Sequence, residues 1–342
     1  MKAITFFKSL PITDEDSLVE IELERPSPGP RDLLVEIRAI SVNPVDAKIR
    51  SGSGPRSPQD ANKVPGWDAA GVVVAVGDHV TSFALGDGVY YAGAVDRSGS
   101  YAEFQIVDER IVGRKPASIG FAAAAALPLT TITAWELMFD RLKIPVGRSA
   151  NGGSLLIIGG AGGVGSIATQ LARQLTGLTV IATASRLETQ AWCREMGAHH
   201  VIDHRQPLAR QVKAIVPGGV NFVLALTKTE DHFDEIIEAL APQGALGVIE
   251  NVAAPLDLNQ LKSKSLSLHW EFMFTRTRYQ TADMAEQGRL LNEVAGLIDA
   301  GLIRSTVREN LGLINAANLK RAHALIESGT AIGKIILEGF VR

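Results

Sequence analysis

Residues Leu155 to Gln170 read LLIIGGAGGVGSIATQ, and this stretch decides the fold. Its apolar start, Leu155–Ile158, predicts a buried strand, and a glycine-rich turn and a helix-forming sequence follow at once. In a G-x-G-x-x-G pattern the first glycine permits a tight turn, the second lets backbone amides approach a phosphate, and the third lets helix pack on strand. We therefore expect a dinucleotide pyrophosphate to bind at the start of this helix, on Gly160, Gly162, Gly163, Val164 and Gly165.

The end of the next predicted strand, Thr179–Ala184, indicates which dinucleotide binds. Sites that prefer NAD place Asp or Glu there for the ribose hydroxyls, whereas this chain has Ser185 and Arg186. A carboxylate would repel a 2′-phosphate, but a hydroxyl and a guanidinium can hydrogen-bond it. We expect NADPH rather than NADH. The alternative interpretation is that Arg186 is only a solvated charge at a strand end.

Composition excludes several classes of protein. With 342 residues, 46% of them hydrophobic, the chain is long enough to form two domains with good cores. A net charge of −3 and the lack of a Lys or Arg block argue against a nucleic-acid partner. The chain shows no run of 18 apolar residues and no signal-like N-terminus, so we expect a cytoplasmic protein with no membrane partner. The one cysteine, Cys193, excludes intrachain disulfides and a four-cysteine zinc site.

Strand and helix patterns divide the chain. The first part is rich in short strands separated by turns, which favours a mainly antiparallel, barrel-like domain. An alanine-rich helix, 122–126, is broken by Pro128 and resumes at Thr133. From residue 154 strands alternate with helices, as a doubly wound parallel sheet requires, with strands expected at 155–158, 179–184, 200–202, 220–225, 245–249 and 266–270. We expect the last part of the chain to return to the first domain, with helices over 281–300 and 316–328 and strands over 303–307 and 334–338.

Together these motifs resemble the medium-chain dehydrogenase/reductase superfamily over essentially the whole chain. The resemblance rests on residues 41–52, 65–73 and 127–135 and on the glycine turn. Within the superfamily, the chain is similar to the zinc-free quinone oxidoreductase branch. Residues 269–276 are similar to a subfamily labelled zinc-type alcohol dehydrogenase-like. The resemblance implies an α/β protein: a Rossmann doubly wound domain at 127–274 that binds NADP, and a GroES-like antiparallel barrel at 1–126 and 275–342.

The metal ligands of zinc-dependent members are not matched. Where those proteins have a cysteine and a histidine this chain has Asn43 and Trp67, with Asp68 in place of the glutamate. Neither Asn nor Trp is a usual zinc ligand. The adjacent histidines His199 and His200 would point to opposite faces of a strand. We expect no catalytic zinc.

The resemblance also implies residues near the substrate. Asn43 and Lys48 are candidate hydrogen-bond donors to the substrate oxygen, although Asn43 could instead form an Asx turn before Pro44 and Lys48 could be a solvated charge. Trp67 and Trp270 are candidate pocket walls, with core packing as the alternative. Thr133 is expected near the nicotinamide, or else it is a helix hydroxyl bonded to the preceding turn.

His204 stands where many relatives have a tyrosine beside the adenosine phosphate. An imidazole can donate to phosphate, so we expect NADPH binding to strengthen as His204 gains a proton.

Without zinc an alkoxide lacks a Lewis acid, so an ordinary alcohol is a poor substrate. A quinone or conjugated enone accepts hydride more readily because its charge ends on an oxygen that a few donors can hold. We expect an NADPH-dependent reductase of this type, a cytoplasmic homodimer by family resemblance. Two alternatives stay open: an NADPH-binding sensor or structural protein with negligible turnover, and a zinc-dependent alcohol dehydrogenase.

Overall fold

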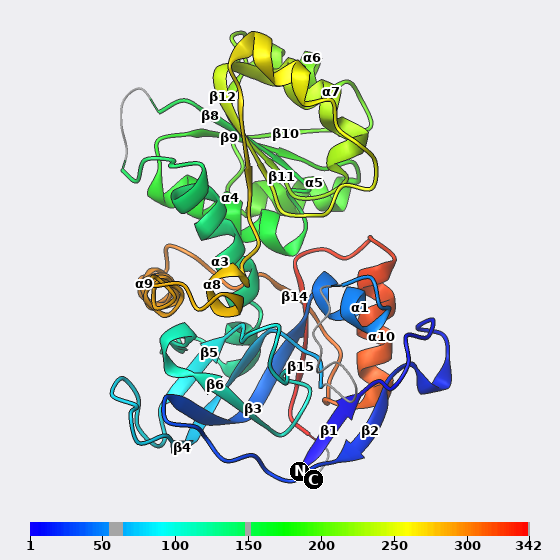
Figure 1. Ribbon diagram of the computed structural model, residues 1–342. Coiled ribbons are helices and arrows are strands. Elements are labelled where there is room, and N and C mark those ends of the chain that lie inside the picture. Colours follow the sequence, from blue (N-terminus) through cyan, green and yellow to red (C-terminus); the bar gives the residue numbers. More distant parts are fainter. Residues whose placement is uncertain (55–63, 148–151, 341–342) are drawn as a thin grey trace. The chain divides into compact units, whose positions relative to one another are not determined.

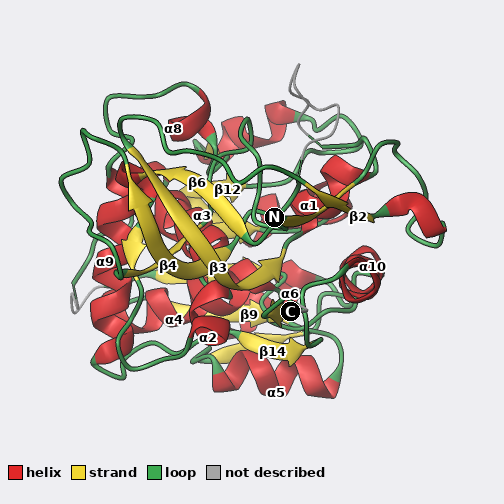
Figure 2. Cartoon of the chain, turned by 90° about the horizontal axis from the view of Figure 1, so that it is seen from below, coloured by secondary structure: helices red, strands yellow, loops and turns green. Residues whose placement is uncertain are grey.

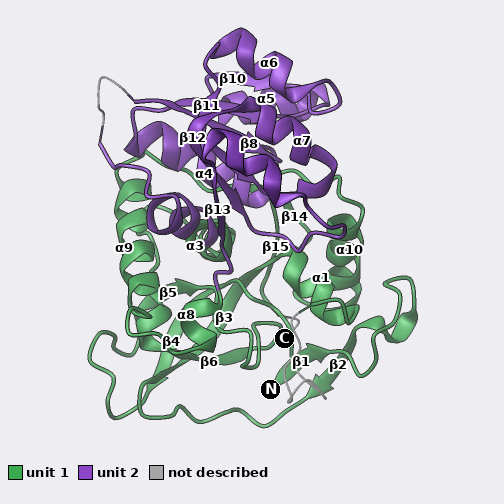
Figure 3. Ribbon diagram, turned by 45° about the horizontal axis from the view of Figure 1, so that its top comes forward, with its two compact units in different colours: residues 1–132, 274–342 green, residues 133–273 purple. Residues whose placement is uncertain are grey.

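The computed structural model describes residues 1–54, 64–147 and 152–340, and the chain divides into two compact units. Unit 1 contains residues 1–132 and 274–342, and unit 2 contains residues 133–273 (Figure 3). The sequence placed the corresponding boundaries at residues 126/127 and 274/275. Unit 1 is therefore built from both ends of the chain, and unit 2 is continuous in sequence.

Unit 2 is a parallel sheet covered by helices, as predicted. Its strand order among the described residues is β10-β9-β8-β11-β12-β13, and every neighbouring pair is parallel. All residues of β8 are buried, which fits a strand covered on both faces. The strands are β8 (Ser154–Ile158), β9 (Thr179–Thr183), β10 (His200–Ile202), β11 (Val220–Ala225), β12 (Leu240–Val248) and β13 (Ser267–Trp270).

Helices α6 (Leu208–Ile215) and α7 (Thr229–Ala239) pack together on this sheet (Figure 1). The core beneath them includes Leu156, Val223, Leu246 and Phe233, all buried. Helices α4 (Gly163–Leu175) and α5 (Leu187–Glu195) follow β8 and β9 and pack against them. The strand order reverses between β8 and β11, so the loops that leave the carboxyl ends of these two strands diverge and form the usual binding crevice of such a sheet.

Unit 1 is built on a mainly antiparallel sheet, also as predicted. Its order among the described residues is β14-β15-β3-β4-β5-β7, with β6 also paired to β3, and only the β14–β15 pair is parallel. Strands β3 and β4 lie side by side through its centre (Figure 2). The strands are β3 (Asp32–Val42), β4 (Ala69–Val76), β5 (Gly88–Tyr91), β6 (Phe104–Asp108), β7 (Gly113–Arg114), β14 (Val307–Asn310) and β15 (Lys334–Glu338), and β1 (Lys2–Thr5) pairs with β2 (Val19–Glu22).

Three predicted elements of the chain need correction. The strand expected over 303–307 is instead β14, which begins at Val307. The hydroxyls of Ser305 and Thr306, just before it, donate to the carbonyls of Ala123 (2.6 Å) and Ala126 (3.3 Å). The alanine-rich helix α2 (Phe121–Ala125) does end before Pro128, but the next helix, α3 (Pro128–Trp135), begins at Pro128 and not at Thr133. A proline at the first helical position lacks only an N–H that would have no partner there. The helix expected over 281–300 is α9 (Glu286–Asp299).

The remaining helical segments are short, apart from α10. They are α1 (Pro44–Arg50), α2 (Phe121–Ala125), α8 (Thr275–Arg278), α10 (Ala316–Glu327), the π-helical η3 (Glu136–Arg141) and the 3₁₀ segments η1 (Glu15–Ser17), η2 (Glu109–Ile111) and η4 (Leu258–Lys264). By length and composition alone, the helical run Phe121–Arg141 could cross a membrane, with mean hydropathy 1.3. However, 83% of its most apolar window is buried inside the protein, which is typical of a core helix.

Candidate functional site

The glycine turn of unit 2 joins β8 to α4. Gly159, the residue before the motif, has the left-handed φ of +83° and makes the tight turn that the sequence had assigned to Gly160. Gly160 serves close packing instead, because a Cβ there would lie 2.8 Å from Ala182 Cβ on β9. Helix α4 then begins at Gly163, with Gly162 as its N-cap. The amides of its first turn precede any intrahelical partner and can receive an anion.

The other two motif glycines differ in what surrounds them. A Cβ on Gly165 would lie 2.3 Å from the Gly159 carbonyl oxygen, so the helix can approach the turn only if residue 165 lacks a side chain. A Cβ on Gly162 would meet only that same oxygen, at an ordinary 3.4 Å. The protein therefore leaves space beside Gly162, where a phosphate could approach the backbone. These residues fit the pyrophosphate of a dinucleotide.

The predicted ribose-phosphate residues lie at the carboxyl end of β9. Ser185 is partly exposed, and Arg186 is exposed at the N-cap of α5. Arg205, which the sequence analysis did not select, reaches the same place from the loop after β10: its Nη2 donates to the Ser185 carbonyl (2.9 Å), and it pairs with Asp203 (2.7 Å). A guanidinium from the end of β10 thus reaches the backbone at the end of β9, where the sequence predicts the 2′-phosphate.

More basic groups follow the neighbouring strands. His204 follows β10 and stacks edge-on with His232 of α7, their ring centroids 6.2 Å apart. Lys228, after β11, occupies a left-handed conformation at the N-cap of α7. Burial lowers the pKa of His204, and the nearby His232, Arg205 and Lys228 lower it further, against the opposing effect of Asp203. One sequence signal could have found Arg205 and Lys228: basic residues directly after consecutive parallel strands meet at one sheet edge.

The candidate nicotinamide and pocket residues of unit 2 are Thr133 and Trp270. Thr133 is buried in α3, and Trp270 ends the edge strand β13 with half of its surface exposed. Their proposed contacts with cofactor and substrate stay predictions.

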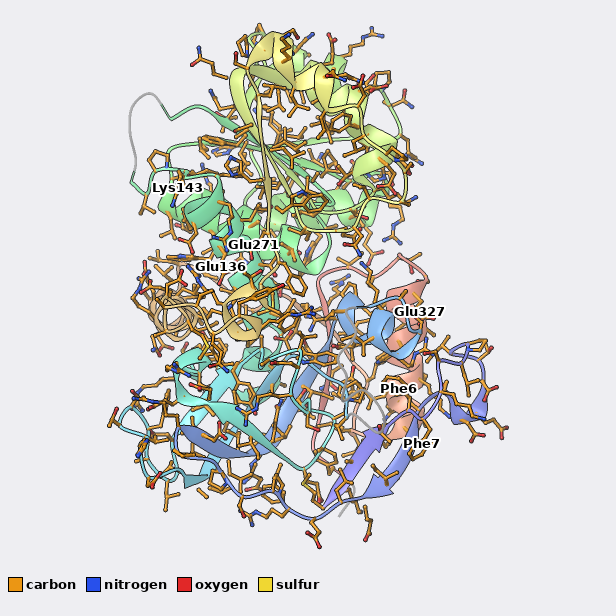
Figure 4. All side chains as sticks on the ribbon, viewed as in Figure 1. Phe6, Phe7, Glu136, Lys143, Glu271 and Glu327 are labelled. Carbon is orange, nitrogen blue, oxygen red and sulfur yellow. The ribbon has the colours of Figure 1, made fainter. Side chains whose placement is uncertain are left out.

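Unit 2 also holds a buried acidic pair that the sequence analysis missed. Glu136 begins η3 and Glu271 follows β13, and their side chains lie close together (Figure 4). Arg141 Nε donates to Glu271 (2.7 Å), and its Nη2 lies 3.7 Å from Glu136. Burial and the neighbouring Glu136 raise the pKa of Glu271 to about 8, against the opposing effect of Arg141. Two carboxyls facing one guanidinium therefore retain a proton at neutral pH.

In unit 1 the predicted donor Asn43 lies in a buried cluster with a lysine. Lys334, the first residue of β15, is 3% exposed and donates from Nζ to three oxygen atoms. These are the Val42 carbonyl (3.1 Å), Asp68 Oδ2 (3.2 Å) and Asn43 Oδ1. Because an ammonium has no lone pair to accept with, this contact identifies the amide oxygen of Asn43 as the atom that faces it.

The rest of the Asn43 amide is also engaged. Its Nδ2 donates to Asp68 Oδ2 (2.8 Å) and to the Trp67 carbonyl (3.3 Å). Asp68 accepts in addition from Ser41 Oγ and from the Leu129 N–H, both at 2.8 Å. Asn43 is also the N-cap of α1, so the local alternative stays open. Its side-chain amide is engaged in this cluster and could donate to a substrate only by exchanging one of these bonds.

A second buried chain of hydrogen bonds starts at the backbone of Asn43. Its N–H donates to Asp46 Oδ2 (2.8 Å), which also accepts from the Tyr101 hydroxyl (3.1 Å). The same hydroxyl lies 3.0 Å from Nε2 of His323 on α10. Burial raises the pKa of Asp46 to about 7, and burial together with the nearby Arg50 lowers the pKa of His323 to about 3. Near neutral pH the imidazole is therefore uncharged.

The other two candidates of unit 1, Lys48 and Trp67, differ in their exposure to solvent. Lys48 is exposed on α1, two residues beyond Asp46. Trp67 is fully buried: its Nε1 donates to the Ala94 carbonyl (3.0 Å), and its ring meets Phe274 edge-on at 6.3 Å. Packing thus accounts for Trp67 in unit 1, and its role as a pocket wall stays a prediction.

Two family models match the chain. Residues 29–117 match the alcohol dehydrogenase GroES-like domain, and residues 196–337 match the model described as zinc-binding dehydrogenase. The first match covers much of unit 1, and the second runs from unit 2 into the last strand of unit 1.

Relatives cover nearly the whole chain. A zinc-type alcohol dehydrogenase-like protein of Staphylococcus aureus (strain MRSA252) is 41% identical over 98% of this chain and 99% of its own length. A crystal structure from Rhizobium etli CFN 42, described as a zinc-dependent alcohol dehydrogenase protein, is 54% identical with a TM-score of 0.95 and covers 100% of this chain and 99% of that one. Escherichia coli quinone oxidoreductase complexed with NADPH is 26% identical with a TM-score of 0.83, over 99% of this chain and 100% of that one.

Proposed function

The chain belongs to the medium-chain dehydrogenase/reductase superfamily, and from this premise we propose an NADPH-dependent reductase that delivers hydride to a quinone or an α,β-unsaturated carbonyl compound without catalytic zinc. The superfamily makes it an oxidoreductase. The choice of acceptor and cofactor is our proposal. We also propose that it acts in the cytoplasm as a homodimer.

One observation carries the choice of NADPH: the basic cluster at the carboxyl ends of β9, β10 and β11. Arg186 follows Ser185 in sequence, Arg205 donates to the Ser185 carbonyl, and Lys228 lies near His204 on the next loop. A 2′-phosphate carries the charge that such groups bind, and no Asp or Glu occupies the positions directly after β9, where NAD-preferring sites have one. The E. coli relative described with NADPH supports the same cofactor.

The chain's residues would divide the work in a simple way. When bound, NADPH supplies the hydride. The α4 N-terminus and the space beside Gly162 hold its pyrophosphate, and Ser185 and Arg186 select its 2′-phosphate. The acceptor oxygen, which gains negative charge, needs hydrogen-bond donors, for which Asn43 and Lys48 remain our candidates.

The first experiment follows the loss of NADPH absorbance with an aromatic ortho-quinone, alongside NADH and with a chelator. We expect chelator-resistant turnover that favours NADPH. Changing Arg186 and Arg205 together to alanine should raise the KM for NADPH at least tenfold and leave that for NADH nearly unchanged, because only NADPH carries the 2′-phosphate. Equal loss with both cofactors would contradict the assigned phosphate site.

Two other functions predict different results. An NADPH-binding sensor would bind the cofactor tightly and consume none with quinones or enones. A zinc-dependent alcohol dehydrogenase would contain one tightly held zinc per chain, and chelation would abolish its activity.

A further inference from the structure

The cluster around Lys334 is built like a cation site. Three oxygen atoms, from Val42, Asn43 and Asp68, converge on its Nζ in a region where Asn43 and Asp68 are fully buried. Ser41 donates to the same Asp68 oxygen that contacts the ammonium. A buried carboxylate needs a nearby positive charge, and here the protein's own last strand provides it.

Zinc, which the family description implies, does not fit these residues. Asn43 and Trp67 stand in the positions of the cysteine and histidine ligands, and the indole Nε1 of Trp67 is a donor, already bonded to Ala94. Among residues 1–54, 64–147 and 152–340, no three His, Cys, Asp or Glu side chains are grouped so that they could hold a metal ion. The cation contact of Asp68 is to a lysine.

We infer that the Lys334 ammonium is the resident cation of this cluster and does there what a metal ion would otherwise do: it neutralises Asp68 and orients the Asn43 amide. The amide is oriented because its oxygen faces Nζ, which leaves Nδ2 directed at Asp68 and the Trp67 carbonyl. The inference rests on the geometry of unit 1, and shares with the proposed function the lack of zinc and the residue Asn43.

The test is chemical rescue of Lys334→Ala. This change removes the atoms of n-propylammonium from a buried site, so the unfolding temperature should fall by roughly 10 °C, the usual size for an unpaired buried charge. Added n-propylammonium should recover much of that loss, whereas tetramethylammonium, which has no N–H to donate, should not. The exposed Lys262→Ala variant is the matched control and should respond to neither salt.

Two further measurements keep the inference testable if Lys334→Ala does not fold. Lys334→Met should be destabilised, and adding Asp68→Asn should restore at least half of the loss, since the unpaired charge is then gone. Elemental analysis of the wild-type protein after dialysis against a chelator should find far less than one zinc per chain. Equal rescue by both salts, no recovery in the double variant, or one retained zinc per chain would overturn the inference. None of these readouts requires a substrate, so failure of quinone reduction would leave them intact.

Discussion

The buried imidazole of His323 makes a quantitative prediction about stability and pH. It is fully buried, and its Nε2 bonds to the Tyr101 hydroxyl at 3.0 Å. Within the described residues its Nδ1 has no hydrogen-bond partner. Adding a proton would place an unpaired charge in this site, near the Arg50 guanidinium that already lowers the pKa of His323. We therefore expect the folded protein to resist protonation that the unfolded chain accepts.

The sign and size follow from the pKa. Burial and Arg50 lower it from 6.5 to about 3, so between these values the unfolded state binds more protons and stability falls as the pH falls. The contribution is complete above pH 6.5. At pH 5 it should be reduced by about 2 kcal/mol, because each pH unit below the unfolded pKa costs about 1.4 kcal/mol. Asp46, whose pKa is raised to about 7, acts in the opposite direction in the same range and would hide the effect in the wild-type protein alone.

A difference measurement removes that complication. His323→Gln keeps a group that can bond to Tyr101 but cannot titrate, and Asp46 is present in both proteins. Urea unfolding at pH 7.5 and pH 5 should show that the advantage of wild type over the variant shrinks by about 2 kcal/mol on acidification. His200→Gln, which removes an exposed imidazole, is the control for losing a histidine that folding does not bury. A difference that is the same at both pH values would refute the reasoning.

Three further predictions concern unit 2. Gly165→Ala should lower both stability and NADPH affinity, because its Cβ would lie 2.3 Å from the Gly159 carbonyl oxygen. Gly162→Ala, with only a 3.4 Å contact, should weaken NADPH binding about tenfold with little change in unfolding temperature. Calorimetry and thermal unfolding would show the contrast, and equal behaviour of the two variants would argue against it. The wild-type protein should lose stability as pH rises from 4.5 through about 8, because the folded Glu271 carboxyl holds a proton over that range and the unfolded one releases it. Glu271→Gln should remove this loss, which urea unfolding of both proteins at pH 6 and pH 9 would measure. The same dependence of stability on pH in both proteins would count against the shared proton. Burial is the main cause of the lowered pKa of His204, so NADPH should bind more tightly to the wild-type protein as the pH falls below 6.5. His204→Ala should abolish this increase. The same NADPH dissociation constant in variant and wild type would remove His204 from the site.

The fold of unit 2 was readable from the sequence because its signals are local. Apolar runs bounded by glycine and polar residues predict buried strands, and all the expected strands of the parallel sheet are present near their expected positions. The glycine turn and the strand end at Ser185 also lie where the pattern placed them. What local patterns missed was Arg205, because its approach to Ser185 depends on two strands lying side by side.

The polar cluster of unit 1 was only half visible. Asn43 and Asp68 stand in recognisable motifs, but no residue near them in sequence indicates that they bind the ammonium of Lys334. Lys334 lies 266 residues from Asp68 and reaches it through the pairing of β15 with β3. A lysine at the start of an apolar strand is usually exposed, so the sequence pattern favours an exposed position for Lys334, whereas the structure buries it. The role of His323 could not be predicted for the same reason, because its hydrogen-bond partner Tyr101 is 222 residues away in sequence.

The return of the chain's end to unit 1 has a consequence for how the protein is made. A ribosome completes β3, β4 and all of unit 2 before it produces Lys334. Until then Asp68 has no counterion and must stay hydrated, so β3 and β4 cannot close over it at low cost. Unit 2, whose strands are continuous in sequence, can fold first, and unit 1 is completed only after Lys334 has been synthesised. A nascent chain stalled before residue 334 should therefore carry a protease-resistant unit 2 beside an unprotected unit 1.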